Sequence, residues 1–390
     1  MKNFSNKKYL HTSAQLVRSG EEYFNTLAKL IEESRHEILF HTYILENDET
    51  GKKILHHLTQ AVNRGVQVSV LLDAFGSGNL DKNFFRELSL SGIRVRRFEP
   101  FFNGNKFHIG RRLHHKVFVA DEECALVSGI NISNRYHGIG EKEWLDFAVM
   151  VRGNICHQLA SICRSIEDKN FFRRNRKVNL LPAKNYKNLM EVLARVRQTD
   201  WVRGKNQIRT SYRKGIRSSE HTVFIIASYF IPGVSLRRAL YAASKRGVQI
   251  KILLAEKSDV PFAKGATEYL YDWMLRSNIR VFEYQPSVVH AKVMAIDNEW
   301  MTIGSYNLNN LSEYSSIELN IDIASESFTR QFTAEVEKII STDCIEITLN
   351  EFSRHGLFRR MSSWFSYQFM RLNFSILFFL QSKSKQNQIE

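Results

Sequence analysis

The feature that most constrains this chain is that a long part of it is written twice. Residues 61–74 read AVNRGVQVSVLLDA, and residues 243–256 read ASKRGVQIKILLAE. A shorter match, SGIRV from Ser91 and SNIRV from Ser277, follows each of them. The distance between the copies far exceeds the period of about 20 to 50 residues found in solenoid repeats. The sequence therefore predicts two copies of one domain rather than an array of small units.

Each copy shows the same order of predicted elements. An amphipathic helix, at about 21–35 and 207–219, precedes a β-rich run, EILFHTYI or TVFIIASYF. A second helix ends at Gly65 or Gly247, both placed as C-caps, and leads into a buried strand. A further helix, a short strand and a hairpin follow. Such alternation predicts an α/β fold with α-β-α layers, in which two mixed β-sheets flanked by helices are related by a pseudo-two-fold axis.

The 390 residues divide into four parts on this pattern. Residues 1–175 form the first repeat, 176–205 a basic connector, 206–347 the second repeat, and 348–390 a distinct tail. The first copy also carries an insertion, FFNGNKFHIGRR, before Leu113. This insertion is either part of a headgroup channel or a solvated loop.

The predicted hairpins place the same polar side chains at the same spacings among apolar neighbours. The first hairpin reads LHHKVFVADEECALVSGIN over 113–131, and the second reads VHAKVMAIDNEWMTIGSYN over 289–307. Their shared polar positions are His114, Lys116, Asp121 and Asn131 in the first copy, and His290, Lys292, Asp297 and Asn307 in the second.

The spacing within each set favours phosphate chemistry. Side chains alternate along a strand, so His114 and Lys116 point to one face, as do His290 and Lys292. An imidazole beside an ammonium group calls for an anion between them, and a phosphate supplies one. If the two copies meet, two histidines face one phosphorus atom from opposite sides. One ring can then attack while the other protonates the leaving oxygen.

Simpler interpretations exist for each residue alone. A single histidine among apolar residues is more often a satisfied core residue, and a single lysine more often reaches to the surface. A metal site is not favoured, because the lysine repels cations and no carboxylate or thiolate has ligand spacing. The recurrence of the whole set in two diverged copies argues against chance. Asp121 and Asp297 fall on the opposite face parity at the strand ends, which predicts that they brace loops or a basic group.

At these residues the chain resembles the phospholipase D superfamily, whose signature is HxK, four residues, Asp, six residues, then G-G/S-x-N. The second copy matches fully and ends GSYN, whereas the first reads SGIN, with Ser128 in place of the usual glycine. The resemblance implies a two-step reaction through a phosphohistidine, without metal or cofactor.

The resemblance also implies roles for individual residues. His114 and His290 would be nucleophile and general acid/base, and the lysines and aspartates complete the catalytic motifs. His114 is the favoured nucleophile, but the pseudo-symmetry allows either assignment. Lys116, Lys292, Asn131 and Asn307 would hold phosphate oxygens. A carboxylate downstream of each asparagine would orient a histidine ring, and the candidates are Asp146 and Glu318. A surface position on an edge strand is the alternative for Glu318.

Within the superfamily, the motif order is similar to that of bacterial cardiolipin synthases. The stretches that carry this likeness are HTYILENDETGKKIL, RGVQVSVLLDAFGS, and ASYFIP with LLAEKSD. The likeness implies transfer of a phosphatidyl group from one phospholipid to the headgroup hydroxyl of another, with phosphatidylglycerol as acceptor. The chain would resemble the shorter, peripheral type that lacks N-terminal membrane helices.

Charge and the tail bear on the partner. Lys and Arg outnumber Asp and Glu by 55 to 40, for a net charge of +15, so anionic lipid and nucleic acid both fit. The tail from Leu357 interleaves arginines with aromatic and aliphatic residues, which suits a bilayer interface, although a helix packed on the core is the alternative. The N-terminus lacks the apolar segment of a signal peptide, and no run is long enough to span a membrane.

These features predict a peripheral protein on the cytoplasmic face of the cell membrane, with anionic phospholipids as partners. The four cysteines show no paired spacing, which favours a reducing compartment. Three alternatives stay open: a phospholipase D-type hydrolase, a nuclease of the same superfamily, and a catalytically dead phosphate-binding scaffold.

Overall fold

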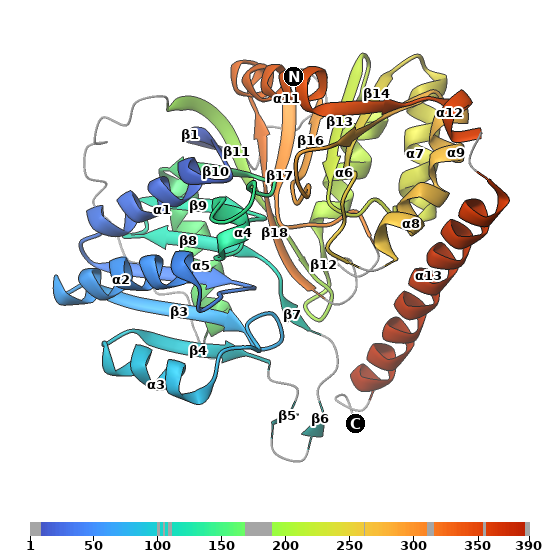
Figure 1. The fold of residues 1–390 in the computed structure, drawn as a ribbon. Coiled ribbons are helices and arrows are strands. Elements are labelled where there is room, and N and C mark those ends of the chain that lie inside the picture. Colours follow the sequence, from blue (N-terminus) through green and yellow to red (C-terminus); the bar gives the residue numbers. More distant parts are fainter. Residues whose placement is uncertain are drawn as a thin grey trace.

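The computed structural model describes residues 9–99, 102–103, 106–107, 111–167, 189–260, 262–309, 316–353 and 356–386. Figure 1 shows two similar α/β halves, one from each repeat, that meet along a central seam. Residues 1–8, residues 176–188 of the predicted connector, half of the insertion before Leu113 and residues 387–390 lie outside the described residues.

The first repeat alternates strands and helices before its hairpin, as the sequence predicts. Its elements are β1 (Leu10–Arg18), α1 (Glu21–Glu33), β2 (Glu37–Thr42), α2 (Glu49–Asn63), β3 (Gln67–Asp73), α3 (Lys82–Leu90), β4 (Arg94–Phe98), β5 (Phe102–Asn103), β6 (Lys106–Phe107), β7 (Arg112–Leu113), β8 (Lys116–Ala120), β9 (Cys124–Ser128), α4 (Asn134–His137), β10 (Phe147–Arg152) and α5 (Asn154–Glu167).

The second repeat follows the same order and then extends into the tail. Its elements are β11 (Met190–Asp200), β12 (Lys205–Asn206), α6 (Gln207–Ser218), β13 (Thr222–Ala227), α7 (Val234–Lys245), β14 (Gln249–Ala255), α8 (Ala263–Tyr269), α9 (Tyr271–Arg276), β15 (Ile279–Tyr284), β16 (Lys292–Ile296), β17 (Trp300–Gly304), β18 (Ser316–Ala324), α11 (Glu326–Asp343), β19 (Cys344–Ile347), α12 (Leu349–Ser353) and α13 (Leu357–Gln386).

The strands of the two repeats form mirrored halves of one mixed sheet. The first half runs β4-β3-β2-β8-β9-β10-β1 and the second β11-β18-β17-β16-β13-β14-β15, followed by β19. The antiparallel pair β1–β11 joins them. The predicted α/β fold is confirmed. The two expected sheets, however, are hydrogen-bonded into a single one, because β1 and β11 pair across the seam.

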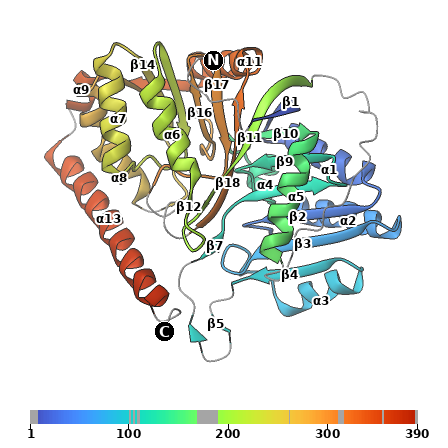
Figure 2. The same ribbon diagram turned by 180° about the vertical axis from the view of Figure 1, so that it is seen from behind.

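Helices cover both faces of the sheet, which gives the predicted layers. In the first repeat, α1 and α2 lie on the face seen in Figure 1, and α5 lies on the face seen in Figure 2. The predicted C-caps are confirmed: Gly65 and Gly247 both have φ of 88°, a left-handed conformation that favours glycine. The preceding helices α2 and α7 end at Asn63 and Lys245, and in both an Arg-Gly pair follows the last helical residue.

The core is continuous across the seam. One buried apolar cluster contains Val149 of β10 and Val127 of β9 together with Ile303 of β17 and Ile321 of β18. One further apolar cluster lies under the outer helices of the first repeat, and another lies under those of the second. Burial of this apolar surface holds the two repeats in a fixed relation, so side chains near the seam can form one site from both.

The boundary of the predicted connector needs correction. Residues 190–200 of the expected connector form β11, a strand inside the sheet that pairs with β1 and with β18. Its apolar residues alternate, with Val192, Ala194 and Val196 buried, as in the corresponding strand β1. The second repeat therefore starts before residue 206.

The tail forms one long helix, α13, which stands apart from the sheet in Figures 1 and 2 and runs toward the end of the molecule where β5 and β6 lie. It packs on α8 through the buried Ser363, Ser366 and Tyr367. Among the described residues, no helix combines the length and the apolar character needed to cross a bilayer.

Candidate active site

Each histidine of the repeated motif lies on a segment that crosses into the other repeat. β7 pairs in parallel with β18 of the second repeat, and the backbone N–H groups of His114 and His115 donate to the Ile317 carbonyl at 3.1 and 3.0 Å. In the mirrored contact, the N–H groups of His290 and Ala291 donate to the Leu145 carbonyl of the first repeat at 2.8 and 3.1 Å.

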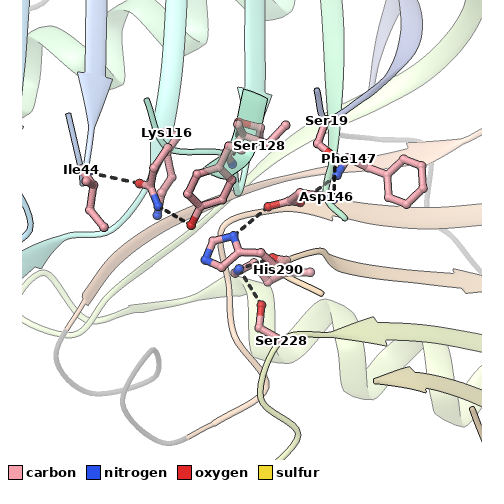
Figure 3. A network of polar contacts seen from close by, with 12 residues as sticks. Ser19, Ile44, Lys116, Ser128, Asp146, Phe147, Ser228 and His290 are labelled. Atoms are coloured by element: carbon pink, nitrogen blue, oxygen red, sulfur yellow. Dashed lines mark hydrogen bonds and ion pairs between the residues drawn. The ribbon is translucent and has the colours of Figure 1, made fainter. Parts of the chain in front are cut away.

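These crossings place each imidazole beside a carboxylate of the opposite repeat. Nδ1 of His114 lies 2.9 Å from a carboxylate oxygen of Glu318, and Nδ1 of His290 lies 2.8 Å from Oδ2 of Asp146. Figure 3 shows His290 and Asp146 facing each other from segments of different repeats, each close to the start of a strand. The sequence predicted both carboxylates as ring-orienting groups, and the structure adds that each contacts the histidine of the other copy.

Both carboxylates are fully buried. Glu318 and Asp146 are 0 % exposed, on or directly before interior strands, so the surface alternative for Glu318 is wrong. Burial raises the pKa of Asp146 to about 7, against the lowering effect of Lys292. Both contacts occupy Nδ1, which leaves Nε2 as the ring nitrogen for chemistry.

The two lysines are buried beside the rings. Lys116 and Lys292 are each 2 % exposed, and their ammonium groups donate to the carbonyls of His114, at 2.6 Å, and of His290. Burial and the nearby charge of Lys292 together lower the pKa of Lys116 to about 7, and burial lowers the pKa of Lys292 to about 8. A bound anion would stabilise the charged form of both ammonium groups, so this buried site favours anion binding.

The histidines share this environment. Burial lowers the pKa of both imidazoles, and the charges of the lysines of both repeats lower each pKa further. Glu318 acts in the opposite direction on His114. The four groups from the two motifs therefore form one electrostatic unit, in which a neutral imidazole can act as a nucleophile.

The two aspartates of the motifs lie elsewhere, and their assignment to the catalytic group is corrected. The carboxylate of Asp121 accepts the backbone N–H groups of Arg35, His36 and Glu37 at 2.7 to 2.9 Å. Asp297 accepts those of residues 220–222 at 2.7 to 2.8 Å. Both brace the junction between a helix and the strand β2 or β13, as their face parity indicated.

The two asparagines lie just after the hairpins and are buried. Asn131 accepts the Ile44 N–H at 3.2 Å and donates to the Tyr136 hydroxyl at 2.9 Å, so its amide positions a neighbouring ring. Asn307, 7 % exposed, occupies the equivalent place after β17. Their contact with phosphate stays a prediction.

Several site residues were missed by the sequence reasoning. Aromatic rings line both histidines: Tyr43 lies 5.0 Å from His114, and Tyr136 and Trp144 lie 5.1 and 6.1 Å from His290. Tyr43 follows β2, Tyr136 lies in α4 and Trp144 precedes β10, and no local pattern shows that these rings face a histidine of the site. Ser228, which accepts from Lys292 at 2.8 Å, belongs to the same group.

The last motif positions differ between the copies in a way that the structure explains. The Ser305 hydroxyl of GSYN donates to Glu318 at 2.5 Å. In the first copy the matching residue is Gly129, where an added Cβ would lie 2.6 Å from the Asp146 carboxylate. The Ser305 hydroxyl therefore holds Glu318 in place, whereas the absence of a side chain at Gly129 leaves room for the carboxylate of Asp146. Ser128, the departure from the usual glycine, accepts the Ile130 N–H at 3.1 Å.

Comparison with known proteins agrees with this geometry. The family model described as "Cardiolipin synthase, PLD-like domain" matches residues 27–160 and 212–340, one match in each repeat. Cardiolipin synthase B of Escherichia coli K12 is 28% identical over 365 residues, which cover 92% of this chain and 87% of that protein. A cardiolipin synthase of Listeria welshimeri is 26% identical over 345 residues, covering 85% of this chain and 69% of that protein.

The fold has a counterpart among solved structures. The crystal structure of phosphatidylserine synthase from Haemophilus influenzae Rd KW20 superposes with a TM-score of 0.73 and 14% identity, covering 94% of this chain and 96% of that one. Because the family model matches more than half of the chain, once in each repeat, the chain belongs to the cardiolipin synthase family of phospholipase D-like proteins.

Proposed function

We propose that this protein is a phosphatidyltransferase that makes cardiolipin from two molecules of phosphatidylglycerol. The observation that carries the proposal is the exchange of His–carboxylate pairs between the repeats, His114 with Glu318 and His290 with Asp146. This exchange ties two imidazoles with equivalent support to one buried, lysine-lined site. Its relatives, named cardiolipin synthases, supply the lipid substrate class.

In the first step, Nε2 of one histidine attacks the phosphorus of a phosphatidylglycerol. The bond from phosphorus to the headgroup oxygen breaks, and the other imidazolium donates its Nε2 proton to that oxygen, so glycerol leaves. The carboxylate at Nδ1 of each ring fixes the tautomer and stabilises the imidazolium form. Lys116 and Lys292 hold the non-bridging oxygens, whose charge raises the pKa of both ammonium groups again.

In the second step, the headgroup hydroxyl of another phosphatidylglycerol takes the place of glycerol. The now neutral imidazole removes its proton, the oxygen attacks phosphorus, and the phosphorus–nitrogen bond breaks. Cardiolipin leaves and both rings return to their starting states. Water in the same place would give hydrolysis, so the aromatic rings around the histidines serve to favour the lipid alcohol over water.

The test is a product analysis. Purified protein is incubated with phosphatidylglycerol vesicles, alone and with phosphatidylethanolamine, and the lipids are separated by thin-layer chromatography. Cardiolipin and released glycerol are expected. Phosphatidic acid alone would show a hydrolase, and no lipid product together with cleavage of single-stranded DNA would show a nuclease.

The second part of the proposal is that α13 holds the protein on the cytoplasmic face of the membrane. One face of the helix packs on α8, where Arg359 pairs with Glu268 at 3.0 Å and Tyr367 stacks on Tyr269 at 4.6 Å. A second face carries a helical stripe of exposed apolar residues at spacings of three and four, namely Phe358, Met361, Phe365, Phe369 and Leu372. Within this stripe, the Phe369 ring also contacts Phe262, directly before α8, at 5.0 Å.

A bilayer interface suits this stripe better than water does. Phe358 is 88 % exposed and Phe365 59 %, whereas large aromatic residues are normally covered. Arg360 and Arg371 lie on the same helix, where they can reach anionic headgroups. The four cysteines are free thiols, which fits a reducing cytoplasm.

Co-sedimentation with anionic liposomes tests the stripe. The triple variant Phe358→Ser/Phe365→Ser/Leu372→Ser and the deletion of 357–390 should both reduce binding. Ser362→Ala, a change at an exposed position of the same helix that removes no apolar side chain, is the matched control. Unchanged binding of a folded triple variant would remove α13 from the membrane contact.

A further inference from the structure

Behind the segment that carries His114 lies a buried chain of polar side chains. Nε2 of His115 lies 3.0 Å from Nδ1 of His41, and Nε2 of His41 lies 3.0 Å from Oε1 of Glu167. Both histidines are 0 % exposed. The other oxygen of Glu167 accepts from Ser69 at 2.9 Å and from Arg94 at 3.1 Å. The chain therefore runs from the residue beside His114 to the end of α5 near the surface.

The second repeat has apolar residues at the three matching positions. The N–H of Asp121 donates to the carbonyl of Glu37 in β2, and the N–H of Asp297 donates to that of Thr222 in β13. Glu37 therefore corresponds to Thr222, and His41, four residues further on, corresponds to Ile226. Ala291 follows His290 as His115 follows His114. Helices α5 and α11 start at the same distance after Asp146 and Glu318, so Glu167 matches an isoleucine. The apolar set, all in one buried cluster, is Ile226, Ala291 and Ile339.

The comparison separates stability from function. The second repeat shows that this position folds with an ordinary apolar core. Buried polar groups must offset the loss of their hydration, and apolar side chains of similar volume are often neutral or stabilising in their place. The polar chain of the first repeat is therefore not needed to hold the fold, and its contact with the segment of His114 points to the site.

We propose that His115, His41 and Glu167 are positioning residues that set the place of the His114 ring, so that the first half-site responds to protonation of His41, a group for which the second half-site has no counterpart. This inference rests on the proposed function, in which both rings act on one phosphorus atom.

The backbone carries the effect from His115 to His114. Both residues donate their N–H groups to the Ile317 carbonyl, directly before Glu318, and the Leu113 N–H donates to Asp73 at 2.8 Å. The two imidazole side chains lie in the short break between β7 and β8. A shift of the His115 ring therefore moves the peptide that aims His114 at its carboxylate.

The charges around His41 define the pH range. From α5 it faces Cys163 and Glu167, from the break before β8 it faces His115, and Arg94 of β4 lies beyond the glutamate. Burial opposes a charge on His41, but Cys163 and Glu167 more than offset it and raise its pKa to about 9.

His115 behaves in the opposite way. Burial lowers its pKa well below the usual value, and the cationic neighbours His41, Lys116 and Arg111, together with His114, lower it further. His41 therefore holds the proton and donates to both partners. Because its folded pKa is raised, the charged form of the chain is complete below about pH 7 and is lost as the pH rises through about 9.

Histidine NMR titration tests the inference without requiring activity. Three proteins with labelled histidine are compared: wild type, the triple variant His41→Ile/His115→Ala/Glu167→Ile, which copies the second repeat, and His41→Gln, which keeps the hydrogen bonds but cannot titrate. The triple variant should shift the titration midpoint of His114 and leave that of His290 unchanged. His41→Gln should restore the His114 midpoint and remove the step near pH 9. Ile226→Val is the matched control in the second repeat.

The same variants are then assayed for transfer. The triple variant should lower kcat about 10- to 100-fold at unchanged KM, because the ring is misplaced rather than removed. Equal shifts at His114 and His290, or an unmoved His114 in a folded triple variant, would overturn the inference. If the triple variant unfolds, the presence of the pH 9 step in His41→Gln overturns it and its loss supports it. A wild type without transfer activity would refute the proposed function and leave the titration result standing.

Discussion

The two half-sites contain the same reacting groups but are supported in different ways. The segment that carries His114 is held by two contacts: Asp73 accepts the backbone N–H of Leu113, and His115 begins the buried polar chain through His41. The segment of His290 continues into Ala291, which packs in an apolar cluster. The surroundings of the carboxylates differ as well. The Ser305 hydroxyl donates to Glu318, whereas the matching residue beside Asp146 is Gly129, which has no side chain to donate.

This difference teaches which parts of a duplicated site are set by chemistry. The imidazoles, lysines and carboxylates, which act on phosphorus, keep their places in both copies. The groups behind them have diverged, because many packings can hold a strand in position. The imidazoles should therefore give large and similar effects in both repeats, whereas the carboxylates and the groups behind the rings should show how the half-sites differ.

The largest effect is expected from the rings themselves. His114→Ala and His290→Ala should each lower transfer at least about 1,000-fold with nearly unchanged stability, because each removes a nucleophile or an acid/base group. Initial rates and thermal melts measure both. If either variant kept most of its activity, the comparison would fail at its first step, since one repeat would then suffice.

The carboxylates should rank next and should separate the half-sites. Glu318→Gln should lower kcat about 100-fold, because it removes the charge that stabilises the His114 imidazolium. Asp146→Asn should cost less at pH 7, since burial raises the pKa of Asp146 to about 7 and leaves it only partly ionised. Its cost should grow as the pH rises. A pH series of kcat for both variants checks this, and equal losses at every pH would contradict it.

The motif aspartates should affect stability alone and equally in both repeats. Asp121→Asn and Asp297→Asn each weaken three backbone contacts to a carboxylate and should cost about 2 kcal/mol of unfolding free energy. Chemical denaturation measures that cost, and the activity per folded molecule should stay near wild type. A loss of kcat at full stability would return these aspartates to the reaction.

The last prediction concerns the lysines and the pH dependence of binding. Their pKa values are lowered to about 7 and 8 in the free site, and a bound phosphate diester would raise them. Binding then takes up protons, so affinity for a soluble glycerophosphodiester should fall as the pH rises from 7 to 9, by about tenfold per pH unit for each proton. Calorimetry in two buffers of different ionisation enthalpy measures the uptake. Binding without proton uptake would contradict the lowered values.

Much of the fold and of the site could be predicted from the sequence because the chain repeats itself. The matched hairpins identified His114, Lys116, His290 and Lys292, and the C-caps and layers followed from local patterns. β11 was missed although its alternation of Val192, Ala194 and Val196 was visible, because it lay in a stretch judged by its charge.

Other features depend on contacts between distant segments, which no local pattern records. The pairing of Glu318 with His114 depends on the alignment of β7 with β18. Tyr43 and Asp73 reach the site from the ends of β2 and β3. The chain from His115 to Glu167 joins three elements that become neighbours only after the sheet has formed.

The central claim is that two rings from two repeats perform successive displacements at a single phosphorus. The stereochemical course of transfer from a phosphatidylglycerol with a chiral thiophosphate tests it most directly. Two in-line steps through a phosphohistidine each invert the configuration, so the product should show net retention. Net inversion would mean that the acceptor attacks the donor lipid in one step, and would contradict the account.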